Sequence, residues 1–289
     1  MSKWDGKTKG TLLGYKFFIF SIKVLGLPPV YFVLRFVTYY YYLFATKARE
    51  SIVDFYQKTI GLTRKEAKKL TRKNIFIFGQ TLVDRHAFLL NKAKRISYSF
   101  NNEEKLIEIK DSGKGAILLS AHVGNWETAG NLLKHRVTNT INVVMLDAEY
   151  KKIKTFVDAT TGGSKFNIIP IKNDLTHVIK INNALKNSEF VAIHADRYME
   201  GTKSIELDFF GMPVKFPYGP FLIASKFKVP VVFVFAVKEN KNHYTLSAET
   251  PSGDSKTPEE IAKDYVTEVE RMVRKYPEQW FNYYNYFAQ

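Results

Sequence analysis

Between residues 115 and 275 the chain alternates short apolar runs with helical segments, and this alternation restricts the fold more than any other feature. The runs predict strands at residues 115–121, 141–146, 167–171, 189–194 and 230–237. The segments between them predict helices at residues 126–136, 150–161, 174–187 and 217–227. Strands and helices in alternation form a mostly parallel or mixed sheet covered on both faces. We therefore predict an α/β fold, with one domain over residues 48–289 that carries the sheet and its helices.

Two capping boxes mark further helices. Thr63-Arg-Lys-Glu66 opens a helical stretch that runs towards Leu90, and Thr257-Pro-Glu-Glu260 opens a closing helix that runs to about Lys275. Residues 252–256 are the most polar connection between elements, and we predict an exposed loop there.

The stretch His122–Glu127, read His-Val-Gly-Asn-Trp-Glu, lies where the first predicted strand ends and a helix begins. Asn125 is a suitable cap for a helix that starts at Trp126, which places Glu127 in the first turn. A carboxylate near one ring nitrogen of a histidine leaves the other nitrogen free to take a proton from a hydroxyl. We interpret His122 as a general base and Glu127 as its partner. The alternative is a loop histidine that only satisfies local hydrogen bonds.

A second polar cluster follows the strand predicted at 189–194. In open α/β sheets ligands bind beyond the carboxyl ends of strands, so this cluster and His122 are candidates for one cleft. Glu200-Gly-Thr-Lys-Ser offers a flexible backbone, a hydroxyl and a cation, which together suit a phosphate. We assign acceptor-headgroup or phosphate binding to Asp196, Arg197, Glu200, Gly201, Thr202 and Lys203. The alternative is a solvated loop.

The next stretch, residues 207–221, combines aromatic residues with glycines and prolines before an apolar helix. Such a surface suits a wall beside an alkyl chain, and the residues assigned to it are Phe209, Phe210, Gly211 and Phe221. An ordinary tight turn that feeds a core helix fits the same residues equally well.

Residues 1–47 form a predicted membrane-associating region, because residues 12–44 are rich in large apolar and aromatic side chains. The longest charge-free runs, 24–34 and 36–46, have 11 residues each, fewer than the roughly 18 of a spanning helix. Four consecutive tyrosines at 39–42 and nearby lysines suit a shallow interfacial position, as a hairpin or an oblique anchor. No small-residue site follows an uninterrupted apolar run, so a cleaved signal peptide is not expected. The alternative is two core helices packed on the main domain.

Composition narrows the partners. With 43 basic and 28 acidic residues the net charge is +15, and such a surface attracts nucleic acid, anionic lipid or an acidic protein. The chain has no cysteine, which excludes disulfides, thiolate catalysis and sulfur-based zinc sites. The basic residues are spread among the helices and form no recognised RNA-binding signature, so we do not expect nucleic acid as a partner.

Together these residues resemble the bacterial lipid A biosynthesis (late) acyltransferases, a branch of the lysophospholipid acyltransferase superfamily. Four features in order carry the resemblance: His122–Glu127, Asp196 with its glycine-containing loop, Phe209-Phe210-Gly211 with Pro217-Tyr-Gly-Pro-Phe221, and Pro277-Glu-Gln-Trp280. The resemblance spans the chain. It implies transfer of a fatty acyl chain from acyl carrier protein, or from coenzyme A, to a lipid hydroxyl at the cytoplasmic face of the bacterial inner membrane.

The resemblance also implies the mechanism. His122 is the expected base and Glu127 its orienting partner in direct acyl transfer to the hydroxyl. Backbone amides at the start of the helix at 126 are expected to stabilise the oxyanion, with Asn125 and Trp126 in oxyanion or positioning roles. We expect no metal and no cofactor, and no Gly-x-Ser-x-Gly elbow of a covalent serine enzyme is present.

Two departures from the family pattern concern the acceptor. Asp147 ends the strand after the histidine motif where members usually carry arginine, and residues 281–287 replace their arginine-rich end with aromatic residues and asparagines. Both argue against an acceptor as heavily phosphorylated as lipid A. Conversely, residues 200–204 are similar to the Glu-Gly-Thr-Arg-Ser motif of glycerolipid acyltransferases. We predict a membrane-associated O-acyltransferase with a lipid A-like lipid or glycolipid acceptor. The alternatives are a glycerolipid acyltransferase and a non-catalytic basic binder of membrane or nucleic acid.

Overall fold

A seven-stranded sheet forms the centre of the computed structural model, which describes residues 12–133, 137–146, 167–172, 174–253 and 257–287. Five strands run parallel in the order β8 (Val231–Asn240), β2 (Ala116–Ser120), β5 (Phe190–His194), β3 (Ile141–Leu146) and β4 (Asn167–Ile171). Next to β8, β9 (His243–Glu249) is antiparallel, and β1 (Ser97–Asn101) pairs parallel with β9. The predicted α/β class with a mostly parallel sheet is confirmed.

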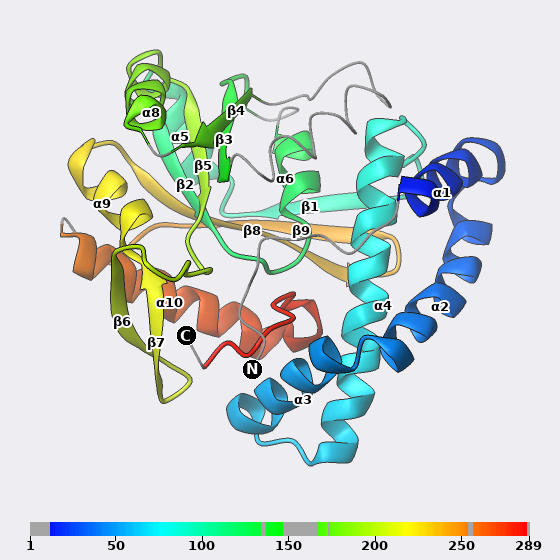
Figure 1. Cartoon of the computed structure of the whole chain (residues 1–289). Helices are drawn as coiled ribbons and strands as arrows, with labels where there is room; N and C mark the ends of the chain where they lie inside the picture. Colours follow the sequence, from blue (N-terminus) through cyan, green and yellow to red (C-terminus); the bar gives the residue numbers. More distant parts are fainter. Residues whose placement is uncertain (1–11, 134–136, 147–166, 173, 254–256, 288–289) are drawn as a thin grey trace.

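Helices cover both faces of the sheet because its strands carry apolar side chains on both faces. Along β2, Ile117 and Leu119 belong to one buried cluster, whereas Ala116 and Leu118 belong to the other. The first cluster includes residues from α3 (Thr46–Ile60), α8 (Thr176–Lys186), α9 (Tyr218–Lys226) and α10 (Pro258–Lys275). The second includes residues from α1 (Leu12–Leu25), α2 (Leu27–Phe44), α5 (Glu104–Asp111) and α6 (Trp126–Leu133). The long helix α4 (Arg64–Leu89) contributes to both clusters (Figure 1).

Both capping boxes are confirmed, since Thr63 and Thr257 each cap their helix with the glutamate three residues on. Most predicted elements match within three residues at each end. The sequence reading missed β1, α5, β9 and the hairpin of β6 (Ser204–Phe209) and β7 (Met212–Pro217). The helix predicted at 150–161, the end of the helix predicted at 126–136 and residues 254–256 of the predicted loop lie outside the described residues.

The last part of the chain returns to the loop that follows β2. After α10 comes a short 3-10 helix, η1 (Pro277–Gln279). Residues 277–287, which we call the C-terminal segment, then contact the loop after β2. Trp280 forms a β-bridge with Val123, and the Trp280 side chain is fully buried.

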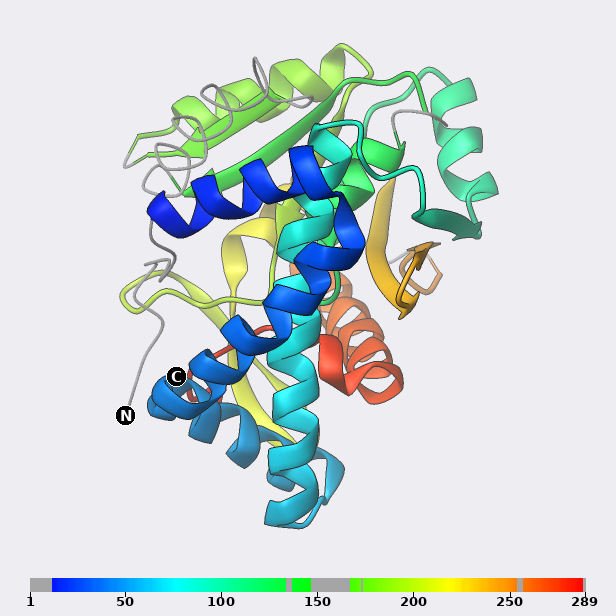
Figure 2. The same cartoon turned by 90° about the vertical axis from the view of Figure 1, so that its right-hand side faces the viewer.

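The N-terminal helices have two contrasting faces. The inner face of α2, with Leu27, Val30, Tyr31 and Leu34, is buried, and α2 lies alongside α4 (Figure 2). The outer face is exposed and apolar: Phe20 on α1 is 65% exposed, and Phe32 and Phe36 on α2 are 61% and 64% exposed. Among the described residues, no helix has both the length and the apolar character needed to cross a membrane. The helices are therefore part of the folded core on one side and leave an aromatic surface on the other.

A buried polar network ties α2 to the sheet. Asp84 of α4 accepts hydrogen bonds from Tyr31 of α2, from Lys238 of β8 and from Tyr244 of β9. Asp84 and Lys238 are both almost completely buried, so their ion pair is shielded from solvent. Because a buried charge is costly without its partner, this network fixes how α2, α4 and the sheet fit together.

Candidate active site

His122 lies in a loop between β2 and α6 that is held on several sides by backbone hydrogen bonds. The His122 carbonyl accepts from the Phe281 amide at 2.9 Å. Gly124 donates to the Gln279 carbonyl at 3.0 Å, and Asn125 donates to the Ala236 carbonyl at 2.7 Å. The loop is thus clamped between β8 and the C-terminal segment.

Gly124 is required for this clamp. Its φ of 69° is a left-handed conformation that favours glycine. A Cβ at this position would lie 2.0 Å from the carbonyl oxygen of Ala236, closer than any real contact. The glycine of the His-Val-Gly-Asn motif therefore lets the backbone lie against β8 next to His122.

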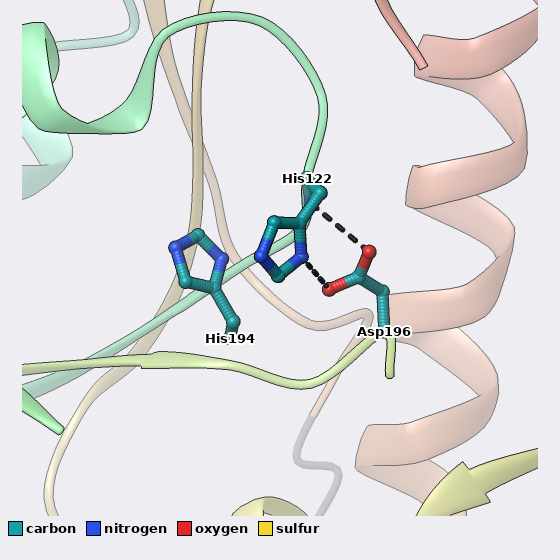
Figure 3. A group of neighbouring side chains, drawn as sticks. All are labelled: His122, His194 and Asp196. Atoms are coloured by element: carbon teal, nitrogen blue, oxygen red, sulfur yellow. Dashed lines mark hydrogen bonds and ion pairs between the residues drawn. The ribbon is translucent and has the colours of Figure 1, made fainter. Parts of the chain in front are cut away.

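Asp196 is the carboxylate that the structure places on His122. Its Oδ1 lies 2.8 Å from the ring Nδ1 of His122, and its Oδ2 accepts the His122 backbone amide at 3.0 Å (Figure 3). His122 follows the end of β2, and Asp196 follows the end of β5. These two strands are neighbours in the sheet, and their last residues, Ser120 and His194, lie opposite each other. The predicted convergence of two strand ends on one site is therefore seen for these two residues.

The surroundings keep Asp196 ionised. Burial opposes its charge, but the adjacent His122 ring, its hydrogen bond and the Arg197 guanidinium hold the pKa of the Asp196 carboxyl well below its ordinary value. An ionised carboxylate accepts hydrogen bonds only, so the His122 Nδ1 must carry the proton that it shares with Asp196. In neutral His122 the lone pair is then on Nε2, which is the arrangement that a general base requires.

A second imidazole lies beside that of His122. The His194 ring is on the side of the His122 ring that faces away from Asp196 (Figure 3), with ring centroids 4.6 Å apart. The His194 ring also meets the Trp126 ring edge-on, with ring centroids 4.7 Å apart. The oxyanion or positioning role of Trp126 stays a prediction. Burial, and then the neighbouring His122, lowers the pKa of His194 to about 3. His194 is thus neutral at physiological pH, and its buried Nδ1 finds no hydrogen-bond partner among the described residues.

His122, His194 and Asp196 each offer one possible metal-ligand atom within 4.8 Å of one another. The Asp196 oxygens, however, already accept from the His122 ring, the His122 amide and the Asn282 side chain. An ion on all three residues would have to displace the hydrogen bond between His122 and Asp196. The group fits a hydrogen-bonded acid–base pair better than a metal centre.

Glu127 lies in the first turn of α6, as expected, with a cation beside it. Its carboxylate forms an ion pair with Arg85 of α4 at 2.6 Å, and both side chains are largely buried. The predicted dyad of His122 and Glu127 is not shown. The structure places Asp196 on the Nδ1 of His122, and it places Glu127 where it joins α6 to α4.

Asn125 caps α6 with its side chain. Its Oδ1 accepts the Thr128 amide at 3.3 Å, while its Nδ2 donates to the Thr81 carbonyl and to the Tyr244 hydroxyl at 3.1 and 3.3 Å. Both sides of the amide are therefore engaged within the protein. The predicted oxyanion or positioning role of Asn125 stays a prediction.

The residues predicted to bind a headgroup do not form one unit. Asp196 is buried under His122, and Arg197 donates to the Asn282 side chain at 2.7 Å and to the Phe281 carbonyl at 3.1 Å. The remaining members form an exposed turn: Glu200, Gly201, Thr202 and Lys203. The Lys203 ammonium lies 4.0 Å from the ring centroid of Tyr218. Headgroup binding by this turn stays a prediction.

The predicted acyl-chain wall consists mostly of core residues. Phe209 and Phe221 are fully buried, Phe210 is 8% exposed, and all three belong to the cluster that includes α10. Phe210 and Gly211, both with positive φ, form the two-residue turn between β6 and β7. Core packing and turn geometry explain these residues, and contact with an acyl chain stays a prediction.

The sequence named one contributor to this site in another role and gave no sign of two others. Asp196 was assigned to a headgroup instead of the base, and neither Asn282 nor Arg85 was singled out. In the sequence, Asp196 appears only as part of a second polar cluster after a strand. That position predicts the edge of the sheet at which Asp196 lies, but it does not predict its hydrogen bond with His122.

Comparison with known proteins adds a family. The model of the bacterial lipid A biosynthesis acyltransferase family matches residues 11–288. A phosphatidylinositol mannoside acyltransferase of Mycobacterium tuberculosis strain H37Rv is 29% identical over 114 residues, which cover 39% of this chain and 35% of the relative. The protein of the same name from strain CDC 1551 matches to the same extent. The chain therefore aligns with about a third of the length of these curated relatives.

Proposed function

Because the chain belongs to the bacterial lipid A biosynthesis acyltransferase family, we propose that it moves a fatty acyl chain from a thioester to a hydroxyl of a lipid or glycolipid. The donor in this proposal is acyl carrier protein or coenzyme A carrying the acyl chain. The observation that carries the proposal is the His122–Asp196 pair, which leaves Nε2 of a neutral histidine as a proton acceptor at the strand ends.

In the proposed reaction, Nε2 of His122 takes the proton of the acceptor hydroxyl while the oxygen attacks the thioester carbonyl. The resulting imidazolium is stabilised by the Asp196 carboxylate at Nδ1. The tetrahedral intermediate then expels the thiolate, which takes the proton from the imidazolium. One ester bond forms, one thioester bond breaks, and His122 returns to its neutral state. A base of this kind typically contributes about 10²–10⁴-fold to the rate.

Asp196 replaces Glu127 as the orienting carboxylate in this proposal. It meets both the ring and the backbone of His122, so it fixes the tautomer and the place of the loop together. Glu127 supports the site less directly, through Arg85 and the start of α6.

A membrane position of the enzyme is supported by the outer face of α1 and α2. Aromatic side chains gather there, and Lys16, Lys23 and Arg35 are exposed among them. Such a surface suits a helix pair that lies in the interface, with its aromatics among the lipids and its cations near anionic headgroups. We place the enzyme at the cytoplasmic face of the bacterial inner membrane, where a lipid acceptor meets a cytoplasmic donor.

The donor and acceptor classes rest on charge and on the relatives. A net charge of +15 favours an acidic carrier protein as the donor. The curated relatives are named for phosphatidylinositol mannoside, a glycolipid, which supports a glycolipid acceptor. The exposed turn at 200–203 has one lysine, and this favours an acceptor with few phosphates.

The test is product identification. Purified protein in detergent is incubated with palmitoyl-coenzyme A or palmitoyl-acyl carrier protein, and with a phosphatidylinositol mannoside, a lipid A precursor or a lysophospholipid. Mass spectrometry then shows which acceptor gains the acyl mass. We expect a new ester on the glycolipid acceptors. Transfer to the lysophospholipid alone would support a glycerolipid acyltransferase, and no transfer from either thioester would overturn the proposal.

A further inference from the structure

Asn282 of the C-terminal segment touches the carboxylate behind the base. Its Nδ2 donates to Oδ2 of Asp196 at 3.0 Å, and its side chain is only 2% exposed. It lies 86 residues from Asp196 in sequence, and neither the family motifs nor the mechanism above uses it.

Arg197 fixes which way the Asn282 amide points. The Nε of Arg197 donates to Oδ1 of Asn282 at 2.7 Å, and a guanidinium can only donate. The amide oxygen must therefore face Arg197, so the NH₂ group must face Asp196. Arg197, next to Asp196 in the chain, in this way turns Asn282 into a hydrogen-bond donor to the carboxylate.

The hydrogen bond from Asn282 stabilises the negative charge of the Asp196 carboxylate. Oδ2 receives the Asn282 NH₂ and the His122 amide, whereas Oδ1 receives the His122 ring. Hydrogen bonds to a carboxylate favour its charged form and lower its affinity for a proton. When Oδ2 accepts hydrogen bonds, the carboxylate is a weaker acceptor at Oδ1 for the proton on the His122 Nδ1. The hold of Asp196 on His122 thus depends on Asn282.

The other polar groups around the pair come from several elements. His194 ends β5, Asp196 and Arg197 follow it in the chain, and the Tyr286 hydroxyl of the C-terminal segment donates to the Asp196 carbonyl at 2.6 Å. The Tyr265 hydroxyl of α10 donates to the Ser120 carbonyl at 2.8 Å. On α6 and α4, Glu127 and Arg85 neutralise each other. Among the side chains named here, Asn282 supplies the neutral hydrogen bond to the Asp196 oxygen that does not hold the ring.

We propose that Asn282 is a positioning residue that sets the proton affinity of His122 through its hydrogen bond to Asp196. The proposal rests on the proposed function only for its consequence on the rate. The titration of His122 is itself a property of the folded protein, with or without a substrate.

The experiment compares three variants of the full chain. Asn282→Ala removes the donor, and Asn282→Asp keeps an acceptor for Arg197 but turns a carboxylate towards Asp196. The matched control is Asn74→Ala. Asn74 is also buried and also holds the C-terminal segment. Its Nδ2 donates a hydrogen bond to the Trp280 carbonyl at 2.8 Å, and its Oδ1 accepts one from the Tyr283 hydroxyl at 2.7 Å. It makes none of the hydrogen bonds to Asp196 described above.

The first readout is nuclear magnetic resonance of ¹⁵N-histidine-labelled protein, with the His122 signals identified by their loss in His122→Ala. We expect the His122 titration midpoint to rise by about half a pH unit in Asn282→Ala and about one unit in Asn282→Asp, because Asp196 loses a stabilising donor and then gains a like charge. In Asn74→Ala the midpoint should stay at the wild-type value. An unchanged midpoint in both folded Asn282 variants, or an equal rise in Asn74→Ala, would overturn the proposal.

The second readout is the acyl-transfer rate against pH, with palmitoyl-coenzyme A and the best acceptor from the product test. We expect the acid limb of kcat/KM to move up by the same amount as the titration, with KM for the donor within about two-fold of wild type. If the wild-type protein transfers no acyl group, the proposed function fails while the titration still tests Asn282. If transfer proceeds and the acid limb does not move in a folded Asn282→Asp variant, the inference fails alone.

Discussion

The Asp196 carboxylate holds His122 at two points, accepting the ring Nδ1 at 2.8 Å and the backbone amide at 3.0 Å. One side chain therefore fixes both the tautomer of the imidazole and the path of the loop that carries it. This double contact links the end of β2 to the end of β5. Any change that moves one strand end against the other should therefore displace the His122 ring.

Replacing Gly124 should disrupt the loop. In Gly124→Ala the new Cβ would meet the Ala236 carbonyl at 2.0 Å, and the φ of 69° would be strained as well. We expect a loss of at least about 2 kcal/mol in the free energy of unfolding, together with most of the activity. Urea unfolding and the transfer assay measure both. Gly219→Ala, with open space around its Cβ position, is the control. A Gly124→Ala protein as stable and active as this control would contradict the clamp.

The ion pair of Arg85 and Glu127 should stabilise the junction of α4 and α6. We expect Glu127→Gln and Arg85→Gln each to cost about 1–3 kcal/mol in urea unfolding, because each removes one member of an ion pair between largely buried side chains. The double variant should cost less than the sum. Additive losses would show that the pair contributes nothing. If Glu127→Gln abolishes transfer as fully as His122→Ala without loss of stability, Glu127 takes part in the chemistry after all.

Acid should destabilise the protein through two buried histidines. Burial and then His122 lower the pKa of His194 to about 3, and burial and then Arg85 lower the pKa of His86 to about 4. Both stay neutral in the folded protein down to those values, while in the unfolded chain they take up protons below their ordinary pKa of about 6.5. The contribution of these two neutral histidines to the free energy of unfolding is therefore complete above about pH 6.5, the ordinary pKa, and it decreases as the pH falls below that value.

The expected slope is about 1.4 kcal/mol per pH unit for each such histidine, or roughly 2 kcal/mol each between pH 7 and pH 5. Urea unfolding at the two pH values measures it. His194→Asn should remove its share of the slope, because asparagine does not titrate. A stability that is flat from pH 7 to pH 5 would show that these histidines gain protons freely in the folded state.

The two faces of α2 should respond differently to substitution. Phe32→Ser with Phe36→Ser removes two exposed aromatics, and we expect weaker cosedimentation with anionic lipid vesicles, by about a hundred-fold, at unchanged thermal stability. Tyr31→Phe removes a hydrogen bond to buried Asp84 and should cost about 1–3 kcal/mol of stability while vesicle binding is retained. Wild-type vesicle binding by the double serine variant would argue against the outer face as the membrane contact.

Local signals in the sequence predicted the elements well. β3 and β4 match their predicted bounds, and the helix start at Trp126 follows from Asn125 as its cap. Each of these depends on residues within a few positions of one another, where apolar periodicity and capping chemistry are visible. Capping residues and buried runs need no knowledge of the rest of the chain.

The contacts that complete the site depend on the order of strands in the sheet. β5 lies beside β2 although β3 and β4 come between them in the chain, so Asp196 reaches His122 across 74 residues. The C-terminal segment brings Asn282, which is 86 residues after Asp196 in the sequence, to the same carboxylate. Glutamate five positions from His122 was the nearest acid in sequence, but the helix turns it towards Arg85. Spacing along the chain does not reveal such choices.

The most direct test of His122 as the base is the acyl-transfer rate of the folded His122→Ala protein. We expect wild-type circular dichroism and thermal stability, with a rate at least about a hundred-fold below wild type, because the substitution removes the Nε2 that accepts the hydroxyl proton in the proposed reaction. The acyl-transfer rate of Asp196→Asn should also fall, since an amide in place of the carboxylate cannot stabilise the imidazolium. A folded His122→Ala protein that transfers the acyl chain at the wild-type rate would contradict the assignment of His122 as the base.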